Sequence, residues 1–164
     1  MGLLANQQVR LKSRPTSIPQ AENFEIIVEP APTLNEGEIL VRNIFLSVEP
    51  AMRGWVSDVA NYSEPVPIDG VMRSFATGRI VESRDPDFQP DEVVTGLFGW
   101  QDYSVVTAET IQRKVSNNHL PLSTSLGVLG LNGMTAYFGL LDVGQPQTGE
   151  TVVVSTAAGA VGSC

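Results

Sequence analysis

The sequence predicts a mainly β domain followed by the first βα element of a parallel α/β domain, on three observations. Short apolar segments separated by turn residues fill residues 9–115, which is typical of an antiparallel β fold. Two helical patterns follow between residues 123 and 144. The chain then closes with a run of valines, residues 152–154, that leads into small residues.

In the β-rich part, the alternation over residues 24–29 predicts a strand with Phe24, Ile26 and Val28 facing inward. Gly78 is expected to mark a bend or a bulge in its strand. One helical turn is expected over residues 51–55. Further strands are expected over residues 9–15, 38–48, 71–83, 93–98, 100–106 and 111–115.

The helical part begins with a pattern over residues 123–129, for which Ser123 or Thr124 is a suitable cap. A second helix is expected to start at Asn132 and to end at Gly144. Its apolar residues have the i, i+3, i+4, i+7 spacing of a single helix face: Met134, Tyr137, Phe138 and Leu141.

The final segment reads as a buried parallel strand, because a strand covered on both faces carries apolar side chains throughout. It runs into Gly159 and Gly162, with Thr156 where a dinucleotide-binding fingerprint has its first glycine. An ordinary αβ turn after a strand has a similar pattern, so two interpretations stay open. A lone parallel strand needs neighbours, and we therefore expect the chain to be an N-terminal fragment.

The composition and net charge of the chain exclude several classes of function. Of the 164 residues, 42% are hydrophobic and 17% charged, as in globular proteins. The net charge of −8 argues against a nucleic-acid or anionic-membrane partner. The chain has one cysteine, Cys164, and one histidine, His119, which cannot build a zinc site, so no metal is expected. A single cysteine also cannot build a disulfide framework, which predicts a reducing, cytoplasmic location. No secretory signal or membrane span is visible.

Several segments, in this order, resemble the zinc-independent branch of the medium-chain dehydrogenase/reductase superfamily: the prostaglandin (leukotriene) reductases, the plant 2-alkenal double-bond reductases and bacterial curcumin reductase. Residues 43–54 resemble that branch's N-x-x-L-S-V-D-P-Y-M-R-G, and residues 78–83 resemble its G-R-V-V-E-S. Residues 99–103 match G-W-Q-D/E-Y, residues 130–140 resemble G-M-P-G-L-T-A-Y-x-G-L, and residues 157–162 complete the series.

The resemblance implies a GroES-like, partly open barrel domain over residues 1–122. Residues 123–164 would then be connecting helices and the start of an incomplete NADP-binding Rossmann domain. The implied activity is NADPH-dependent reduction of the C=C bond of α,β-unsaturated aldehydes or ketones without zinc. Small-molecule enones or enals would be the substrates, and the protein would form a homodimer through the missing cofactor domain. The alternative is a non-catalytic GroES-like binding or structural module.

The resemblance also assigns the cofactor residues. Gly159, Ala160, Val161 and Gly162 would cradle the pyrophosphate, which requires small side chains and free backbone N–H groups. Met134 and Thr135 would lie near the nicotinamide, where Thr135 can hydrogen-bond the carboxamide. Met134, on an apolar stripe, is as readily a core residue.

On the substrate side, Pro50, Ala51 and Met52 would lie where the pocket approaches the nicotinamide. Ala51 replaces the tyrosine usual in the branch, which implies a roomier pocket or a different specificity. Arg53 is expected to form a structural ion pair. The proton donor and the residues that distinguish NADPH from NADH would lie beyond Cys164, so the catalytic residues are unknown from this chain.

Overall fold

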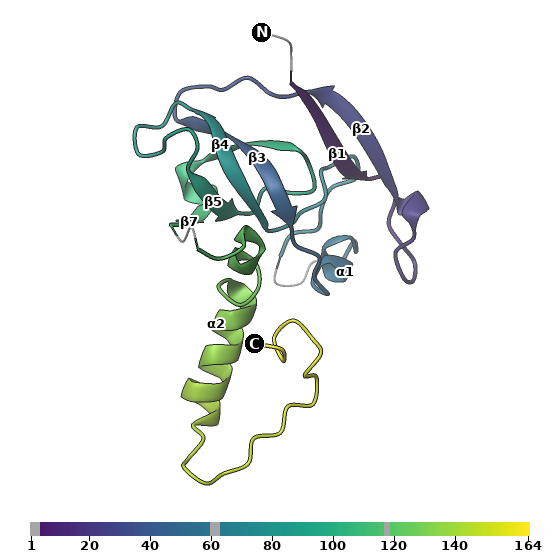
Figure 1. Cartoon of the computed structure of the whole chain (residues 1–164). Helices are drawn as coiled ribbons and strands as arrows, with labels where there is room; N and C mark the ends of the chain where they lie inside the picture. Colours follow the sequence, from purple (N-terminus) through teal and green to yellow (C-terminus); the bar gives the residue numbers. More distant parts are fainter. Residues whose placement is uncertain (1–3, 60–62, 117–118) are drawn as a thin grey trace. The chain divides into compact units, whose positions relative to one another are not determined.

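The computed structural model describes residues 4–59, 63–116 and 119–164. The chain divides into two compact units, Met1–Ser116 and Asn117–Cys164. The first is built mainly from strands, and the second from helical segments and turns (Figure 1). Across the described ranges, every helix is too short or too polar to cross a bilayer.

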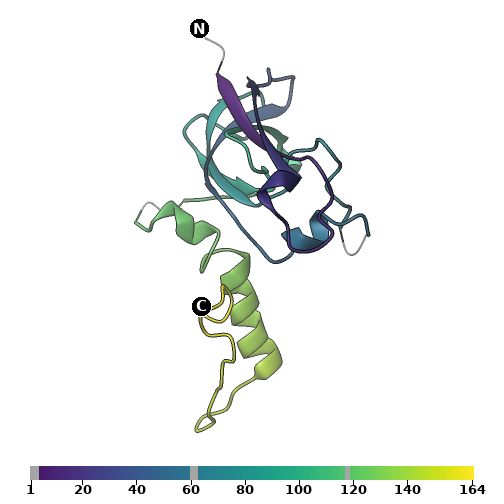
Figure 2. The ribbon, with the colours of Figure 1, turned by 90° about the vertical axis from the view of Figure 1, so that its right-hand side faces the viewer.

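The main sheet of the first unit has five antiparallel strands in the order β6-β3-β4-β5-β7. Figure 2 shows this sheet strongly curved. Its strands are β3 Glu38–Leu46, β4 Ala76–Ser83, β5 Val93–Gly96, β6 Tyr103–Thr107 and β7 Ile111–Lys114.

The irregularity expected at Gly78 is confirmed. Asn43 and Phe45 of β3 pair with the consecutive residues Gly78 and Thr77 of β4, so the additional residue of the bulge is on β3. A Cβ atom at Gly78 would lie 2.7 Å from the carbonyl oxygen of Arg42. The close approach of the two backbones therefore requires glycine here.

The core of this sheet consists of alternate residues from its strands together with Phe98, which follows β5. A strand places every second side chain on the same face, which is how Ile39 and Val41 of β3 come to share the interior with Ile80 of β4. Burial of each such side chain contributes roughly 1.5–3 kcal/mol. The cluster is Ile39, Val41, Ala76, Ile80, Val94, Phe98 and Val106.

A separate two-stranded antiparallel sheet is formed by β1 Ala5–Leu11 and β2 Phe24–Pro30, with the 3-10 turn η1 Ala21–Asn23 before β2. Buried amide side chains join it to residues 99–103. The Gln101 amide nitrogen donates to the carbonyl oxygen of Phe98 over 2.9 Å. The Gln101 amide oxygen accepts from the side chains of Asn6 over 3.2 Å and Gln8 over 3.0 Å.

Two expectations about this two-stranded sheet are wrong. The first strand covers Ala5–Leu11 rather than residues 9–15, because its polar residues are paired in the buried amide network instead of lying in a loop. Ile26 and Val28 do not face inward: they are 66% and 62% exposed. The reason is that β2 pairs with β1 alone, so this end of its apolar face is left uncovered.

The remaining strand predictions are confirmed with shorter bounds, and the helical turn is α1 Met52–Trp55. Strand β4 starts at Ala76, five residues later than expected. The reason is that Met72 pairs with β1 and not with the main sheet: the Met72 N–H donates to the Val9 carbonyl oxygen over 2.8 Å. Strand β6 starts at Tyr103 rather than residue 100.

The first prediction concerns the ion pair that joins β7 to the turn before β5. The Lys114 ammonium lies 2.8 Å from the Glu92 carboxylate, and the hydrogen bond from Lys114, followed by one from the Gln89 backbone, lowers the pKa of Glu92 below its ordinary value of 4.5. A lowered carboxyl pKa contributes stability above the ordinary pKa, and that contribution is lost as the pH falls through the folded-state value.

We expect Lys114→Met to move the pKa of Glu92 back toward 4.5, because the largest cause of its depression is removed. The difference in stability between wild type and variant should shrink as the pH falls below about 4.5. An NMR titration of the Glu92 side-chain carboxyl carbon measures the shift, with Arg79→Met as the control. An unchanged Glu92 pKa in Lys114→Met would contradict this role for the pair.

The second unit begins with the 3-10 helix η3 Leu122–Ser125 and continues with α2 Leu131–Phe138, which runs directly into the π-helical segment η4 Gly139–Gly144. The helix expected over residues 123–129 is therefore a shorter 3-10 turn. The end at Gly144 is confirmed, with Gln145 in the left-handed conformation. The helix starts at Leu131, so Asn132 is not its cap: its side-chain amide donates to the Leu126 carbonyl oxygen over 3.3 Å.

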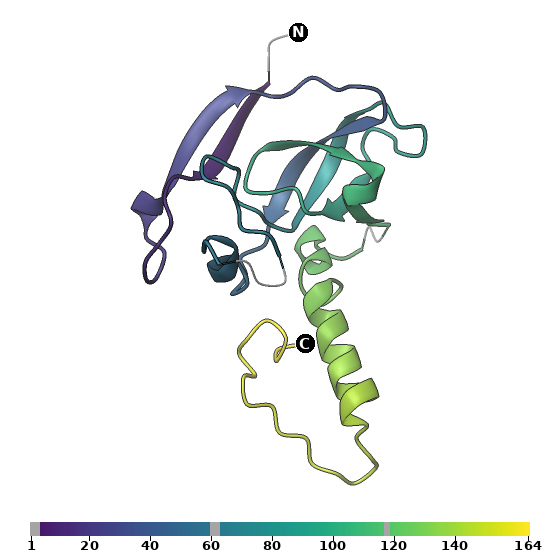
Figure 3. The same ribbon diagram turned by 180° about the vertical axis from the view of Figure 1, so that it is seen from behind.

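The apolar face of this helix is exposed, with Met134 at 56%, Tyr137 at 59% and Phe138 at 47%. The buried strand expected in the valine run is also not formed: residues 151–154 belong to neither sheet, and Val153 is 85% exposed. Figure 3 shows this segment, in yellow, as a coil. Strand formation requires a neighbour for backbone pairing, and no described segment of this unit is a strand.

Candidate functional site

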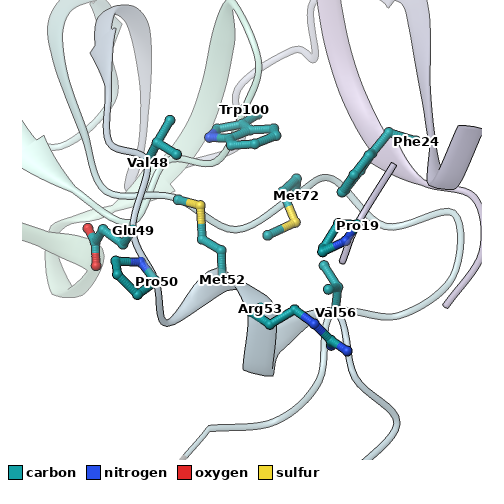
Figure 4. Close-up of a pocket in the computed structure, with 10 residues that line it drawn as sticks. All are labelled: Pro19, Phe24, Val48, Glu49, Pro50, Met52, Arg53, Val56, Met72 and Trp100. Carbon is teal, nitrogen blue, oxygen red and sulfur yellow. The ribbon is translucent and has the colours of Figure 1, made fainter. Parts of the chain in front are cut away.

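A pocket of about 260 Å³ lies in the first unit, beside the loop that follows β3 and the helix α1 (Figure 4). Nearly all of its lining surface is apolar. Its walls come from four parts of the chain: Pro19 and Phe24; residues 48–56; Met72; and Trp100. The lining residues are Pro19, Phe24, Val48, Glu49, Pro50, Met52, Arg53, Val56, Met72 and Trp100.

The chain after β3 is held in place through Ser47. Its N–H donates to the Phe75 carbonyl oxygen over 2.8 Å, and its own carbonyl oxygen accepts from the Ser74 hydroxyl over 2.8 Å and from the Trp100 indole N–H over 3.3 Å. The bond from the indole N–H orients Trp100, which forms one pocket wall. Three of the lining residues, Met52, Val56 and Met72, also belong to the second core cluster, which is Leu11, Met52, Trp55, Val56, Val66 and Met72.

Two of the three substrate residues expected from the sequence line this pocket, namely Pro50 and Met52. Ala51 packs against the second core cluster. Arg53 also lines the pocket, but it forms no ion pair with any residue that the structure describes, so its expected structural ion pair is wrong for these ranges. The carboxylate of Glu49 accepts a hydrogen bond from the Ser47 hydroxyl.

The sequence analysis did not predict the other residues that line the pocket. Trp100 lies in the segment 99–103 that resembles the family motif, and that motif is the one available signal for it. Pro19, Phe24 and Met72 carry no such signal, because the fold alone brings them together. With few polar atoms, this pocket is suited to hold an apolar group and not to transfer a proton.

In the second unit, residues 155–163 form a series of turns. The Gly159 N–H donates to the Thr156 carbonyl oxygen over 2.8 Å, whereas the N–H groups of Ala160, Val161 and Gly162 donate to no residue that the structure describes. A Cβ atom at Gly162 would lie 2.7 Å from the Thr156 carbonyl carbon and overlap its oxygen. Free N–H groups on a turn of small residues fit an anionic pyrophosphate.

The two remaining cofactor candidates lie on α2. The Thr135 hydroxyl donates to the Leu131 carbonyl oxygen over 2.7 Å, so its hydrogen is already used and only its lone pairs can accept a further bond. Met134 is 56% exposed and is therefore not a core residue within this unit. Within residues 4–59, 63–116 and 119–164, no three His, Cys, Asp or Glu side chains are grouped so that they could hold a metal ion.

Comparisons with known proteins agree with the resemblance. A family model described as the N-terminal domain of oxidoreductase matches residues 7–114. The chain is 46% identical over 158 residues to the NADPH-dependent curcumin reductase of Escherichia coli (strain K12), over 96% of this chain and 46% of that protein. It is 35% identical over 163 residues to the 2-alkenal reductase (NADP(+)-dependent) of Nicotiana tabacum, over 97% of this chain and 48% of that protein.

Among solved structures, CurA from Vibrio vulnificus in complex with NADPH superposes with a TM-score of 0.85 at 44% identity, over 96% of this chain and 46% of that chain. The chain thus spans about half the length of the relatives it matches. The family model alone covers more than half of the chain. The chain therefore belongs to this oxidoreductase family, in the zinc-independent branch of the medium-chain dehydrogenases/reductases, and its first unit is the GroES-like domain of that branch.

Proposed function

We propose that the complete protein is an NADPH-dependent reductase of C=C bonds conjugated to an aldehyde or ketone. In this proposal, residues 1–122 are the GroES-like domain on the substrate side and residues 123–164 begin the cofactor domain. The observation that carries the proposal is the set of unused N–H groups at Ala160, Val161 and Gly162, in a chain whose relatives are named as NADP-dependent reductases.

The residues of this chain would bind and orient, and the proton donor would lie beyond Cys164. The three free N–H groups would hold the pyrophosphate of NADPH. The Thr135 oxygen would accept a hydrogen bond from the carboxamide NH₂ of the nicotinamide, since its own hydrogen is bound to Leu131. NADPH, when bound, supplies the hydride. Pro50, Ala51 and Met52 would lie on the substrate side, where Pro50 and Met52 line the apolar pocket.

Ala51 bears on which enones the protein accepts. The branch has a tyrosine at this position, and alanine removes both a phenolic donor and aromatic surface. We expect Ala51→Tyr in the complete protein to lower the KM ratio of a small enone to a bulky one, because the added ring takes up space needed by the bulky substrate. Initial rates with pent-3-en-2-one and 4-phenylbut-3-en-2-one measure the ratio. An unchanged ratio would show that residue 51 does not contact the substrate.

The activity itself is tested with the complete protein, NADPH and a panel of enals and enones, by following the loss of NADPH absorbance. Turnover of several enones but not of their saturated counterparts is the expected result. A panel without any turnover would remove the proposal and favour the non-catalytic GroES-like module. Gel filtration of the same sample tests the homodimer that we propose forms through the remainder of the cofactor domain.

A further inference from the structure

The segment 72–75 connects two walls of the pocket beside α1 through its backbone. The Trp100 N–H donates to the Met72 carbonyl oxygen over 2.8 Å, and Trp100 forms one wall. The Ser47 N–H donates to the Phe75 carbonyl oxygen over 2.8 Å, and the residues that follow Ser47 form another wall. Both walls are therefore paired to the same four residues.

Ser74 adds a side-chain bond within this connection. It is completely buried, at 0% exposure, and its hydroxyl oxygen lies 2.8 Å from the Ser47 carbonyl oxygen and 2.7 Å from the Phe75 carbonyl oxygen. A hydroxyl has a single hydrogen, and the Phe75 oxygen already accepts the Ser47 N–H. From the other described residues, the Ser47 carbonyl oxygen accepts just the Trp100 indole N–H, over 3.3 Å. Ser47 is therefore the acceptor that needs the Ser74 hydrogen.

The wall that follows Ser47 is fixed at its two ends. Residues 48–51 belong to neither a strand nor a helix, so no regular backbone pairing holds them. At the far end, Met52 is 7% exposed and packs in the second core cluster. At the near end, the hydrogen bonds of Ser47 hold the chain. Loss of the Ser74 hydroxyl would leave the Ser47 carbonyl oxygen with one bond, at a length just beyond the usual 2.7–3.2 Å.

We propose that Ser74 is a positioning residue, whose hydroxyl holds Ser47 and thereby fixes residues 48–52 against Trp100. The consequence for the reaction rests on the proposed function, in which residues 50–52 lie on the substrate side. A fixed wall keeps the C=C bond of the enone at a constant distance from the hydride donor. A displacement of about 1 Å at a reacting group can lower a rate by roughly 100-fold.

The connection itself is tested on this chain by hydrogen exchange of the indole N–H groups, because the sequence contains two tryptophans. In Ser74→Ala, the Trp100 indole N–H should exchange at least roughly tenfold faster than in wild type, since its acceptor is no longer held. Trp55, at 5% exposure, is the internal reference, because a general loss of stability would accelerate both groups. Trp100→Phe assigns the two signals. Unchanged exchange at Trp100, or an equal increase at both groups, would overturn the proposal.

The effect on the reaction is tested with the complete protein, NADPH and 4-phenylbut-3-en-2-one. We expect Ser74→Ala to lower kcat by roughly tenfold, because the enone is held less precisely. The KM for NADPH should stay within about twofold of wild type, because residues 159–162 lie in the other unit. The deuterium isotope effect on kcat, with NADPH labelled at the transferred position, should increase, because hydride transfer becomes slower relative to the other steps.

Ser104→Ala is the matched control, because it removes a hydroxyl from a serine that is similarly buried, at 2% exposure. The Ser104 hydroxyl donates to the Phe98 carbonyl oxygen and accepts from Gln101 and Asn43, none of which lines the pocket. Its kcat and its isotope effect should equal those of wild type. A Ser104→Ala protein as slow as Ser74→Ala would assign the loss to a missing buried hydroxyl in general and overturn the proposal.

The failure of this inference is distinct from the failure of the proposed function. If the wild-type complete protein reduces no enone while Trp100 exchange still rises selectively in Ser74→Ala, the proposed function fails and the bond that fixes the wall stands. If the enone is reduced and Ser74→Ala keeps the wild-type kcat and isotope effect, the positioning role of Ser74 fails and the reductase stands.

Discussion

Gln101→Leu is expected to lower the free energy of unfolding of this chain by about 3 kcal/mol or more. The Gln101 side chain uses its full hydrogen-bonding capacity: it donates to the Phe98 carbonyl and the Ser104 hydroxyl over 2.9 Å each, and it accepts from Asn6 and Gln8. Leucine has a similar volume but replaces none of these four bonds, and the Gln8 amide nitrogen, whose bond is to Gln101, loses its partner. Each buried polar group that loses its partner costs about 1–3 kcal/mol.

The matched control is Gln7→Leu, on the exposed side of the same strand β1. No hydrogen bond of the Gln7 side chain is formed with any described residue, so its replacement should change stability by less than about 0.5 kcal/mol. Urea unfolding followed by circular dichroism measures both variants. Equal stabilities of Gln101→Leu and Gln7→Leu would show that the amide network does not hold β1 to residues 99–103.

Gly162→Ala is expected to weaken NADPH binding by the complete protein by roughly 10- to 100-fold. The Cβ atom would overlap the Thr156 carbonyl group, so the turn must open. Opening it redirects the N–H groups of residues 160–162, each of which would contribute about 1.5–3 kcal/mol when bound to a charged phosphate oxygen. Fluorescence titration with NADPH measures the loss.

Gly139→Ala is the control for this experiment, because a Cβ atom at Gly139 has no neighbour within 4 Å and the residue lies in the helical segment η4. Its NADPH affinity should equal that of wild type. A Gly162→Ala protein that binds NADPH as tightly as Gly139→Ala would remove the turn from the cofactor site.

The sequence predicted those parts of the fold that depend on neighbouring residues in the chain, such as alternating apolar residues and turns. The alternation from Phe24 onward and the turn residues between segments predicted most strands with small errors in their ends. The strand β1 was misplaced because Asn6 and Gln8 are polar and buried, and their partner Gln101 is more than ninety residues away. The valine run at 152–154 was predicted as a strand, but a strand depends on a neighbour that the described second unit does not contain.

The candidate site was predictable to a similar extent. Pro50 and Met52 were identified through the segment 43–54 and do line a pocket. Phe24 and Met72 were not, because an apolar residue in a strand or loop looks the same whether it faces the core or a ligand. The roles of Met134 and Thr135 at the nicotinamide stay predictions.

Transfer of deuterium from [4-²H]NADPH tests the central claim most directly. The complete protein is incubated with each C4 epimer of the labelled cofactor and 4-phenylbut-3-en-2-one, and the product is analysed by NMR. The account predicts a saturated ketone with deuterium on the carbon β to the carbonyl, from one of the two epimers. Deuterium on the carbonyl carbon, in an allylic alcohol, would contradict it.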